Sequence, residues 1–278
     1  MKPASTGRPA ATELDLQHVR IVDEGDVIVL VLDNPESNAL TRPLVREFHA
    51  ALDAVCSEEI MRPVVITGAG RAFSTGGDLE ALLEGLELGG DAAAAESDTS
   101  LSLLANMILR LHHLPVPTIA AINGQAAGAG FSLALACDVR IASEHVALNF
   151  AYGALGASPD GGMTWFLPRL VPPARASQLL LEQPVLRAQA ALDEGLVSDV
   201  VAHDSLMTAA LKRARRLAVK APHSLRTARL LIEAGAAPSL EAQLRRERAA
   251  FATAARTDDL RAGVAAMLEG RRVEFTGR

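Results

Sequence analysis

Two glycine-rich segments, well separated along the chain, constrain its fold more than any other feature. The first is Ala72–Asp78 (AFSTGGD) and the second is Ala121–Gly130 (AINGQAAGAG). A short apolar strand signal precedes each one, Val64–Thr67 and Thr118–Ala121 respectively, and a helix-compatible run follows. Because glycine and alanine leave the backbone accessible, both segments present N–H groups at a helix start. Two such donors that face one point would form an oxyanion hole.

The composition is that of a helix-rich α/β protein with a substantial core. The chain has 278 residues, of which 49% are hydrophobic and 22% are charged, enough for one large domain or two small ones. Aromatic residues make up only 3%. Together with abundant alanine and leucine, this favours helices packed by small residues over a strand-rich sandwich.

Charge and hydropathy argue against several classes of partner. The formal net charge of −6 gives no indication of nucleic-acid binding. No apolar run approaches the length of a membrane span, and residues 1–11 lack the apolar core of a signal peptide. We therefore expect a cytoplasmic protein with no membrane partner.

The cysteines and histidines indicate neither disulfides nor metal. Cys56 and Cys137 are too few and too dispersed for a disulfide framework or a zinc site, and both are expected to be buried thiols. His112 and His113 are expected to form a helix C-terminal cap or a surface pair. No His, Asp or Glu cluster has the spacing of metal ligands, so the sequence predicts no metal.

The order of strand and helix signals divides the chain into three parts. Residues 1–12 are polar and without periodicity, which predicts a mobile tail. Residues 13–195 carry strand and helix signals in alternation, beginning with a hairpin over Val19–Val22 and Val27–Leu32. Within this part Thr41 is a candidate helix cap, and Gly89–Asp98 is predicted to be a flexible loop.

Residues 196–278 are predicted to be helical. The predicted helices around and within this part are Ala174–Leu181, Ala188–Glu194, Ser205–Val219, Ser224–Glu233, Ser239–Ala255 and Leu260–Leu268. The first helix of residues 196–278 has one apolar stripe opposite a face of lysine and arginine. Such a stripe suits either a contact between subunits or packing within the chain.

With two further segments, the glycine-rich segments resemble the enoyl-CoA hydratase/isomerase (crotonase) family. The further segments are Asn34–Leu40 (NPESNAL) and Leu155–Gly162 (LGASPDGG). The resemblance runs from about Val27 to the C-terminus and implies a spiral of ββα units. It also implies that residues 196–278 are a trimerisation region, so that the chain forms a homotrimer or hexamer. The implied substrate is an acyl-CoA; coenzyme A is then part of the substrate, and no tightly bound cofactor is expected.

The resemblance also implies which residues form the site. Gly77 and Ala129 match the two oxyanion-hole residues, whose backbone N–H groups bind the thioester oxygen. The positions that match backbone contacts to the coenzyme A arms are Ser37, Asn38, Ala39, Leu40, Phe73, Ser74, Thr75 and Gly76. Arg271 and Arg272 could meet coenzyme A phosphates from a neighbouring subunit or form a solvated basic tail.

The catalytic positions depart from the pattern of the family's hydratases. Ser132 and Tyr152 stand where hydratases carry two glutamates, and neither is a good general base near neutral pH. Asp160 matches the catalytic acidic residue of several isomerases and of ring-opening or dehalogenating relatives. The same Asp160 is also a candidate helix N-cap. We interpret Asp160 as the acid/base of an isomerase that passes through a thioester enolate.

Other functions remain open at this stage. The chain could be an enoyl-CoA hydratase, could catalyse carbon–carbon bond formation or cleavage, or could be a catalytically silent CoA-binding scaffold. A dinucleotide-binding dehydrogenase fits poorly, because the third glycine of its fingerprint would fall on Phe73.

Overall fold

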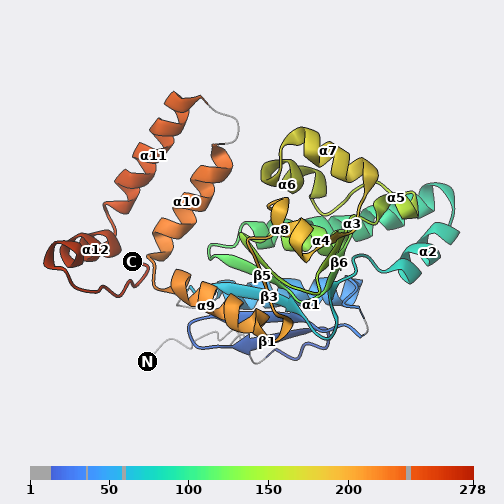
Figure 1. The fold of residues 1–278 in the computed structure, drawn as a ribbon, viewed down its shortest axis with the longest axis horizontal. Coiled ribbons are helices and arrows are strands. Elements are labelled where there is room, and N and C mark those ends of the chain that lie inside the picture. Colours follow the sequence, from blue (N-terminus) through green and yellow to red (C-terminus); the bar gives the residue numbers. More distant parts are fainter. Residues whose placement is uncertain (1–13, 36, 58–60, 236–238) are drawn as a thin grey trace, which may run out of the picture.

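The computed structural model describes residues 14–35, 37–57, 61–235 and 239–278. The predicted N-terminal tail, residues 1–12, lies outside these residues. Two β-sheets and the helices around them form the body of the molecule, and three C-terminal helices project from it (Figure 1). No helix in the described part of the chain has the length and apolar character needed to cross a membrane.

The larger sheet has six strands in the order β1-β2-β3-β5-β7-β10. The strands are β1 Val19–Asp23, β2 Ile28–Leu32, β3 Val64–Gly68, β5 Thr118–Ile122, β7 Val139–Ser143 and β10 Asp199–Val201. The β1–β2 pair is the predicted hairpin and is antiparallel, while the other pairs are parallel.

The smaller sheet has four strands in the order β4-β6-β8-β9. They are β4 Ala72–Ser74, β6 Gln125–Ala127, β8 Ala147–Asn149 and β9 Leu186–Arg187. Three times, in β3–β4, β5–β6 and β7–β8, the chain passes from the larger sheet directly into the smaller one. This repeat confirms the predicted spiral of strand–strand–helix units.

Helices cover the sheets and form the C-terminal part of the chain. They are α1 Arg42–Cys56, α2 Leu79–Glu87, α3 Gly90–His112, α4 Ala129–Leu135, α5 Tyr152–Leu155, α6 Met163–Leu170, α7 Pro173–Glu182, α8 Ala188–Asp193, α9 Leu206–Ala218, α10 Pro222–Ala234, α11 Leu240–Ala254 and α12 Asp258–Glu269. As predicted, Thr41 caps α1, because its side chain accepts a hydrogen bond from the N–H of Leu44.

The predicted loop over Gly89–Asp98 is wrong. After α2 the chain turns at Gly89, which has φ 72, and α3 begins at Gly90 and runs through the four alanines that follow. Alanine is the strongest helix former, so this low-complexity stretch favours a helix rather than a loop.

The core lies on both faces of the larger sheet. Alternate residues of β2 point to opposite faces, so Ile28 and Leu30 pack on the side of α1 and α3 whereas Val29 packs on the side of α9. Because both faces are covered, every residue of this strand is buried and apolar. Ala210 and Ala214 of α9 are fully buried against the sheet, so the apolar stripe of this helix packs within the chain.

The helices that leave the sheet begin with α10. The helical C-terminal part was predicted to begin after residue 195. Two elements beyond that residue still belong to the larger sheet, because β10 pairs with β7 and α9 packs on the sheet. The boundary after residue 195 stays a prediction. In contrast to α9, no described residue of α10 or α11 is buried, and Ile232, Phe251 and Met267 are exposed at 78%, 68% and 84%.

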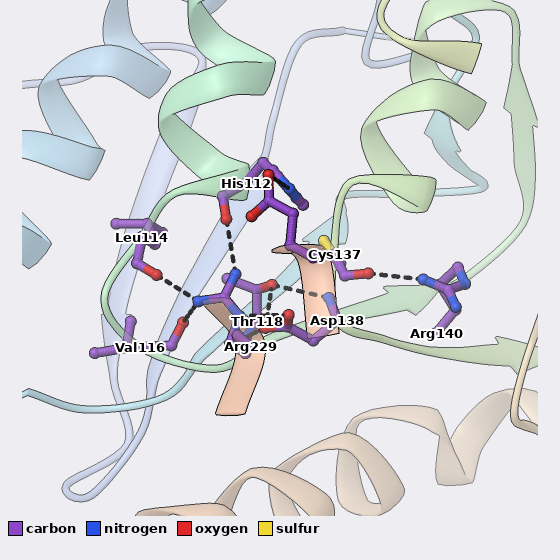
Figure 2. Close-up of polar contacts among 9 residues, drawn as sticks. His112, Leu114, Val116, Thr118, Cys137, Asp138, Arg140 and Arg229 are labelled. Atoms are coloured by element: carbon purple, nitrogen blue, oxygen red, sulfur yellow. Dashed lines mark hydrogen bonds and ion pairs between the residues drawn. The ribbon is translucent and has the colours of Figure 1, made fainter. Parts of the chain in front are cut away.

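Arg229 joins α10 to the core (Figure 2). Its Nε lies 2.6 Å from Oδ1 of Asp138, whose Oδ2 accepts a 2.7 Å hydrogen bond from the Thr118 N–H at the start of β5. The guanidinium also donates to three backbone carbonyls, those of His112, Leu114 and Val116. One side chain thus connects α10 to the end of α3 and to the segment entering β5.

The two cysteines are free but differ in exposure. Cys137 is buried as predicted, and burial raises the pKa of its thiol. Cys56 is exposed, contrary to the prediction. The buried positions of α1, among them Leu52 and Val55, form one stripe, and residue 56 lies beyond it on the solvent side.

Candidate functional site

The two segments predicted to contact coenzyme A lie side by side. The N–H of Leu40 donates to the carbonyl of Gly76 over 2.7 Å, and the N–H of Thr75 donates to the carbonyl of Ser37 over 3.1 Å. Leu40 and Gly77 form an isolated parallel bridge. Phe73, Ser74, Gly76, Asn38 and Leu40 are buried, whereas Ser37, Ala39 and Thr75 are half-buried. The buried residues therefore offer little side-chain surface to a ligand.

Two buried asparagines hold the loop that enters β4. The side-chain amide of Asn38 donates to the carbonyls of Ala69 (2.9 Å) and Ala72 (2.8 Å). The amide of Asn123 donates to the carbonyls of Gly70 and Ala72, both over 3.1 Å. Asn38 has φ 53, a left-handed conformation that asparagine tolerates better than most residues. These amides fix the strand that leads to Gly76 and Gly77.

We expect Asn38→Ala to lower the free energy of unfolding by about 2–4 kcal/mol. The variant leaves the Ala69 carbonyl without its donor and the Asn34 N–H without its acceptor, and it puts alanine at positive φ. Urea denaturation measures the change. Asn38→Gly is the matched control, since glycine loses the same hydrogen bonds without the backbone strain and should be about 1 kcal/mol more stable than the alanine variant. A fall in the free energy of unfolding of less than about 0.5 kcal/mol in Asn38→Ala would contradict the role of the Asn38 amide in holding this loop.

Close backbone approach brings the first glycine-rich segment to the start of α4. Gly76 has φ 96, and a side-chain carbon on it would lie 2.6 Å from the carbonyl oxygen of Ala127 and 3.3 Å from the nitrogen of Ala129. A side chain on Gly130 would lie 2.3 Å from the carbonyl oxygen of Ser74. Only glycine fits at either position. Gly77 therefore follows directly on a residue that lies against Ala129.

Gly77 and Ala129 carry N–H groups that donate to no acceptor among the described residues. Ala129 is the first residue of α4, where the N–H has no partner within the helix. Among the hydrogen bonds of the described residues, none has the N–H of Gly77 or Ala129 as its donor. Gly77 is exposed, whereas Ala129 is only 2% exposed. Within the described residues, the two predicted oxyanion donors thus have no hydrogen-bond acceptor.

Asp160 lies in a hydrogen-bonded cluster with Ser132 and Tyr152, the residues that the resemblance places at the positions of the hydratase glutamates. The hydroxyl of Tyr152 donates to Oδ1 of Asp160 over 3.0 Å and lies 3.2 Å from Oγ of Ser132. Oγ of Ser132 donates to the backbone carbonyl of Asp160 over 3.0 Å. A side-chain carbon on Gly161 would lie 2.8 Å from Cβ of Ser132 and 3.9 Å from Cα of Ala129. The Asp160 loop thus lies on α4 beside Ala129.

The Asp160 carboxylate does not cap a helix. Helix α6 begins at Met163 with Gly162 as its N-cap, and no side chain forms a capping hydrogen bond. Only the backbone carbonyl of Asp160 accepts from the N–H of Met163 (3.0 Å). Gly161 and Gly162 have φ 55 and 83, and this turn leaves the carboxylate facing Tyr152. The N-cap alternative for Asp160 is therefore wrong.

Burial controls the electrostatics of the cluster. It raises the pKa of the Asp160 carboxyl, and the hydrogen bond from Tyr152 opposes this rise. Burial, and then the nearby Asp160 charge, raise the pKa of the Tyr152 phenol, which stays neutral at physiological pH. A half-buried carboxylate whose pKa is raised is a better proton acceptor than an ordinary aspartate. The arrangement can therefore move a proton.

We expect Tyr152→Phe to shift the acidic limb of the pH–rate profile to higher pH. The hydroxyl stabilises the Asp160 carboxylate, so its loss raises the pKa of that carboxyl further, and more alkaline solution is then needed to ionise it. The measurement is kcat/KM from pH 4 to 9. An acidic limb that stays in place, or moves to lower pH, would contradict this coupling.

Arg271 and Arg272 lie far from this cluster within one chain. Both are exposed after α12, and Arg271 pairs with Glu269. Helix α12 and helix α5, which carries Tyr152, stand at opposite ends of the molecule in Figure 1. These arginines could reach a ligand at the site only from another subunit.

Asn123 and Arg229 were not singled out from the sequence, because their partners are backbone carbonyls distant along the chain.

Similarity to known proteins covers almost the whole chain. The sequence model of the family described as enoyl-CoA hydratase/isomerase matches residues 23–278. The chain belongs to this family. The 2,3-dehydroadipyl-CoA hydratase of Escherichia coli K12 is 36% identical over 91% of this chain and 96% of its own length. The 1,2-epoxyphenylacetyl-CoA isomerase of the same organism is 34% identical over 96% of this chain and 99% of its own length.

Solved structures of family members have the same fold. The crystal structure of an enoyl-CoA hydratase from Polaromonas sp. JS666 superposes with a TM-score of 0.86 at 36% identity, covering 92% of this chain and 99% of that one. The crotonase-like α/β fold is thereby confirmed. Since relatives of similar identity include both a hydratase and an isomerase, identity alone does not distinguish the two reactions for this family enzyme.

Proposed function

We propose that this enzyme isomerises an acyl-CoA through a thioester enolate, with Asp160 as its acid/base. The observation that carries the proposal is the contact of the Asp160 carboxylate with Tyr152 and Ser132 beside the N-terminus of α4. The cluster offers one carboxylate for proton transfer, and the resemblance puts hydroxyl groups at the positions of the hydratase glutamates. A single base suffices to take a proton from one carbon and return it to another.

In the proposed reaction the N–H groups of Gly77 and Ala129 donate to the thioester oxygen. Asp160 removes a proton from an acidic carbon of the acyl chain; that C–H bond breaks and its electron pair passes into the enolate. The two donors stabilise the negative oxygen, which in their absence would carry its charge without compensation. The protonated Asp160 then delivers the proton to a different carbon, and the thioester is restored.

Coenzyme A is proposed to bind as part of the substrate along the paired segments Ser37–Leu40 and Phe73–Gly76. Their adjacency and buried side chains support contact through backbone atoms. We propose no tightly bound cofactor and no nucleic-acid or membrane partner. The free thiols of Cys56 and Cys137 suit a reducing cytoplasm, which is the proposed location.

Hydration is the second candidate function. The similarity to a hydratase favours it, but the replacement of both glutamates by Ser132 and Tyr152 leaves no pair of carboxylates to activate water. Within isomerisation, both migration of a double bond and rearrangement of a ring fit one base. The similarity to an epoxide isomerase supports the ring rearrangement.

A panel of acyl-CoA thioesters with mass detection tests the function. The purified enzyme should convert at least one unsaturated or epoxide acyl-CoA into a product of the same mass, separable by chromatography. Products heavier by one water would identify a hydratase. No conversion of any thioester, with coenzyme A still bound, would favour the silent scaffold.

We expect the protein to be a homotrimer or a hexamer, assembled through the C-terminal helices. The exposed apolar side chains of α10–α12 support this, because large apolar surfaces of this kind normally lie in contact with a partner. Light scattering at micromolar concentration measures the mass. A monomer would contradict the proposal and would leave Arg271 and Arg272 without a phosphate from a second subunit.

A further inference from the structure

His112, His113 and Glu233 form a cluster that no step of the proposed reaction uses. The two histidines end α3, and Glu233 lies near the end of α10. Their ligand atoms all lie within 4.8 Å of one another. Nε2 of His112 lies 3.6 Å from Oε1 of Glu233, and Nε2 of His113 lies 4.0 Å from the same oxygen. Both distances are too long for hydrogen bonds.

His112 has a buried nitrogen without a hydrogen bond to any described residue. Its Nε2 is buried and forms no hydrogen bond with the described residues, which is costly for a polar atom. Its ring is held in place by Trp165 and Phe166, whose centroids lie 5.2 and 5.4 Å away in edge-on contacts. The result is an oriented imidazole nitrogen that faces a carboxylate.

From this geometry we infer that His112, His113 and Glu233 bind one Zn²⁺. Two imidazole nitrogens and a carboxylate are a zinc ligand set, and a water molecule would complete the tetrahedron. Zinc ligands about 2.1 Å from the metal lie about 3.4 Å from one another, so the two histidine–Glu233 spacings need to close by only about half an ångström. His113 and Glu233 are 58% and 35% exposed and are free to make this adjustment.

The charges around the cluster permit a cation. Arg229 lies one turn before Glu233 on α10, but its guanidinium is paired with Asp138 and turned to the carbonyls of the α3–β5 segment (Figure 2). Zinc would therefore add a second link beside the one made by Arg229. The metal would fasten α10, and with it the C-terminal helices, to the end of α3.

The sequence alone predicted no metal, because the two adjacent histidines lie far along the chain from Glu233. The proposed site links α10 to the end of α3 and is independent of the Asp160 reaction. Zinc should be bound whether or not the enzyme turns over any acyl-CoA.

Titration of untagged, metal-free full-length protein with ZnCl₂ tests the site. Calorimetry should give one equivalent per chain in the wild type. Glu233→Gln and His113→Asn should each weaken binding at least tenfold, because even the loss of an outer-shell partner of a metal ligand costs roughly 10–100-fold in affinity. His145→Asn is the matched control. This exposed histidine lies beside His203, elsewhere on the surface, so its loss should leave the binding of one equivalent of zinc per chain unchanged.

Hydrogen exchange gives a readout of the proposed role. Zinc should slow amide exchange in α10 of the wild type and leave exchange unchanged in Glu233→Gln. The inference is overturned if the wild type binds no zinc, if Glu233→Gln and His113→Asn bind it as tightly as the wild type, or if His145→Asn removes the bound equivalent.

Discussion

Asp160→Asn is expected to lower the kcat of isomerisation by roughly 100-fold or more, because an amide cannot accept the proton that the carboxylate removes. The fold should persist. The Oδ1 of asparagine can still accept the hydrogen bond from Tyr152, and the backbone contact to Met163 does not depend on the side chain. Steady-state kinetics on any acyl-CoA that the wild type isomerises give the ratio.

The stability of Asp160→Asn serves as its control. Burial raises the pKa of the Asp160 carboxyl in the folded protein above its ordinary value of 3.8. The protonated carboxyl therefore stabilises the folded state fully below pH 3.8, and this stabilisation is lost as the pH rises through the raised pKa. At neutral pH the ionised carboxylate is thus a cost, and asparagine should leave the protein at least as stable as the wild type. Loss of activity in a stable variant isolates the chemistry. Near-normal turnover would refute Asp160 as the base.

Ala129→Pro is expected to lower kcat by about 100- to 1,000-fold, which is the usual effect of removing one oxyanion-hole donor. Proline has no N–H, and Ala129 is the first residue of α4, where proline is tolerated because no hydrogen bond within the helix is lost. The variant therefore removes the proposed donor but no hydrogen bond within α4.

Two comparisons make the Ala129→Pro experiment specific. Ala129→Gly keeps the N–H and should retain activity close to that of the wild type. Coenzyme A without an acyl group has no thioester oxygen, so its affinity should be the same for wild type and Ala129→Pro. Weaker binding of coenzyme A would show that the proline ring obstructs the site, and unchanged turnover would exclude this N–H as a donor.

The fold was predictable because several local signals agreed. Apolar strand signals, the glycine-rich segments and the cap at Thr41 each have a local physical cause, and the structure places elements there. The start of α3 was missed because Gly89 and Gly90 suggested a loop, although the alanines after them favour a helix. Cys56 was misplaced because an apolar run does not show which way its last residue faces.

The candidate site was predictable as a set of positions but not as an arrangement. The glycine-rich segments indicated backbone donors, yet the close approach of Gly76 to Ala129 depends on the pairing of two distant segments. The contact of Asp160 with Tyr152 depends on positive φ at Gly161 and Gly162, and the same sequence equally suggests a helix cap. The meeting of His112 with Glu233 depends on where α10 docks.

Exchange of deuterium from solvent into the acyl chain tests the central claim most directly. The wild type in deuterated buffer should incorporate deuterium at the carbon next to the thioester carbonyl, or at the carbon that gains the proton, and mass spectrometry of recovered acyl-CoA detects it. Asp160→Asn should show no incorporation above the uncatalysed rate while still binding coenzyme A. Incorporation by Asp160→Asn at the wild-type rate would contradict the account, because another group would then be moving the proton.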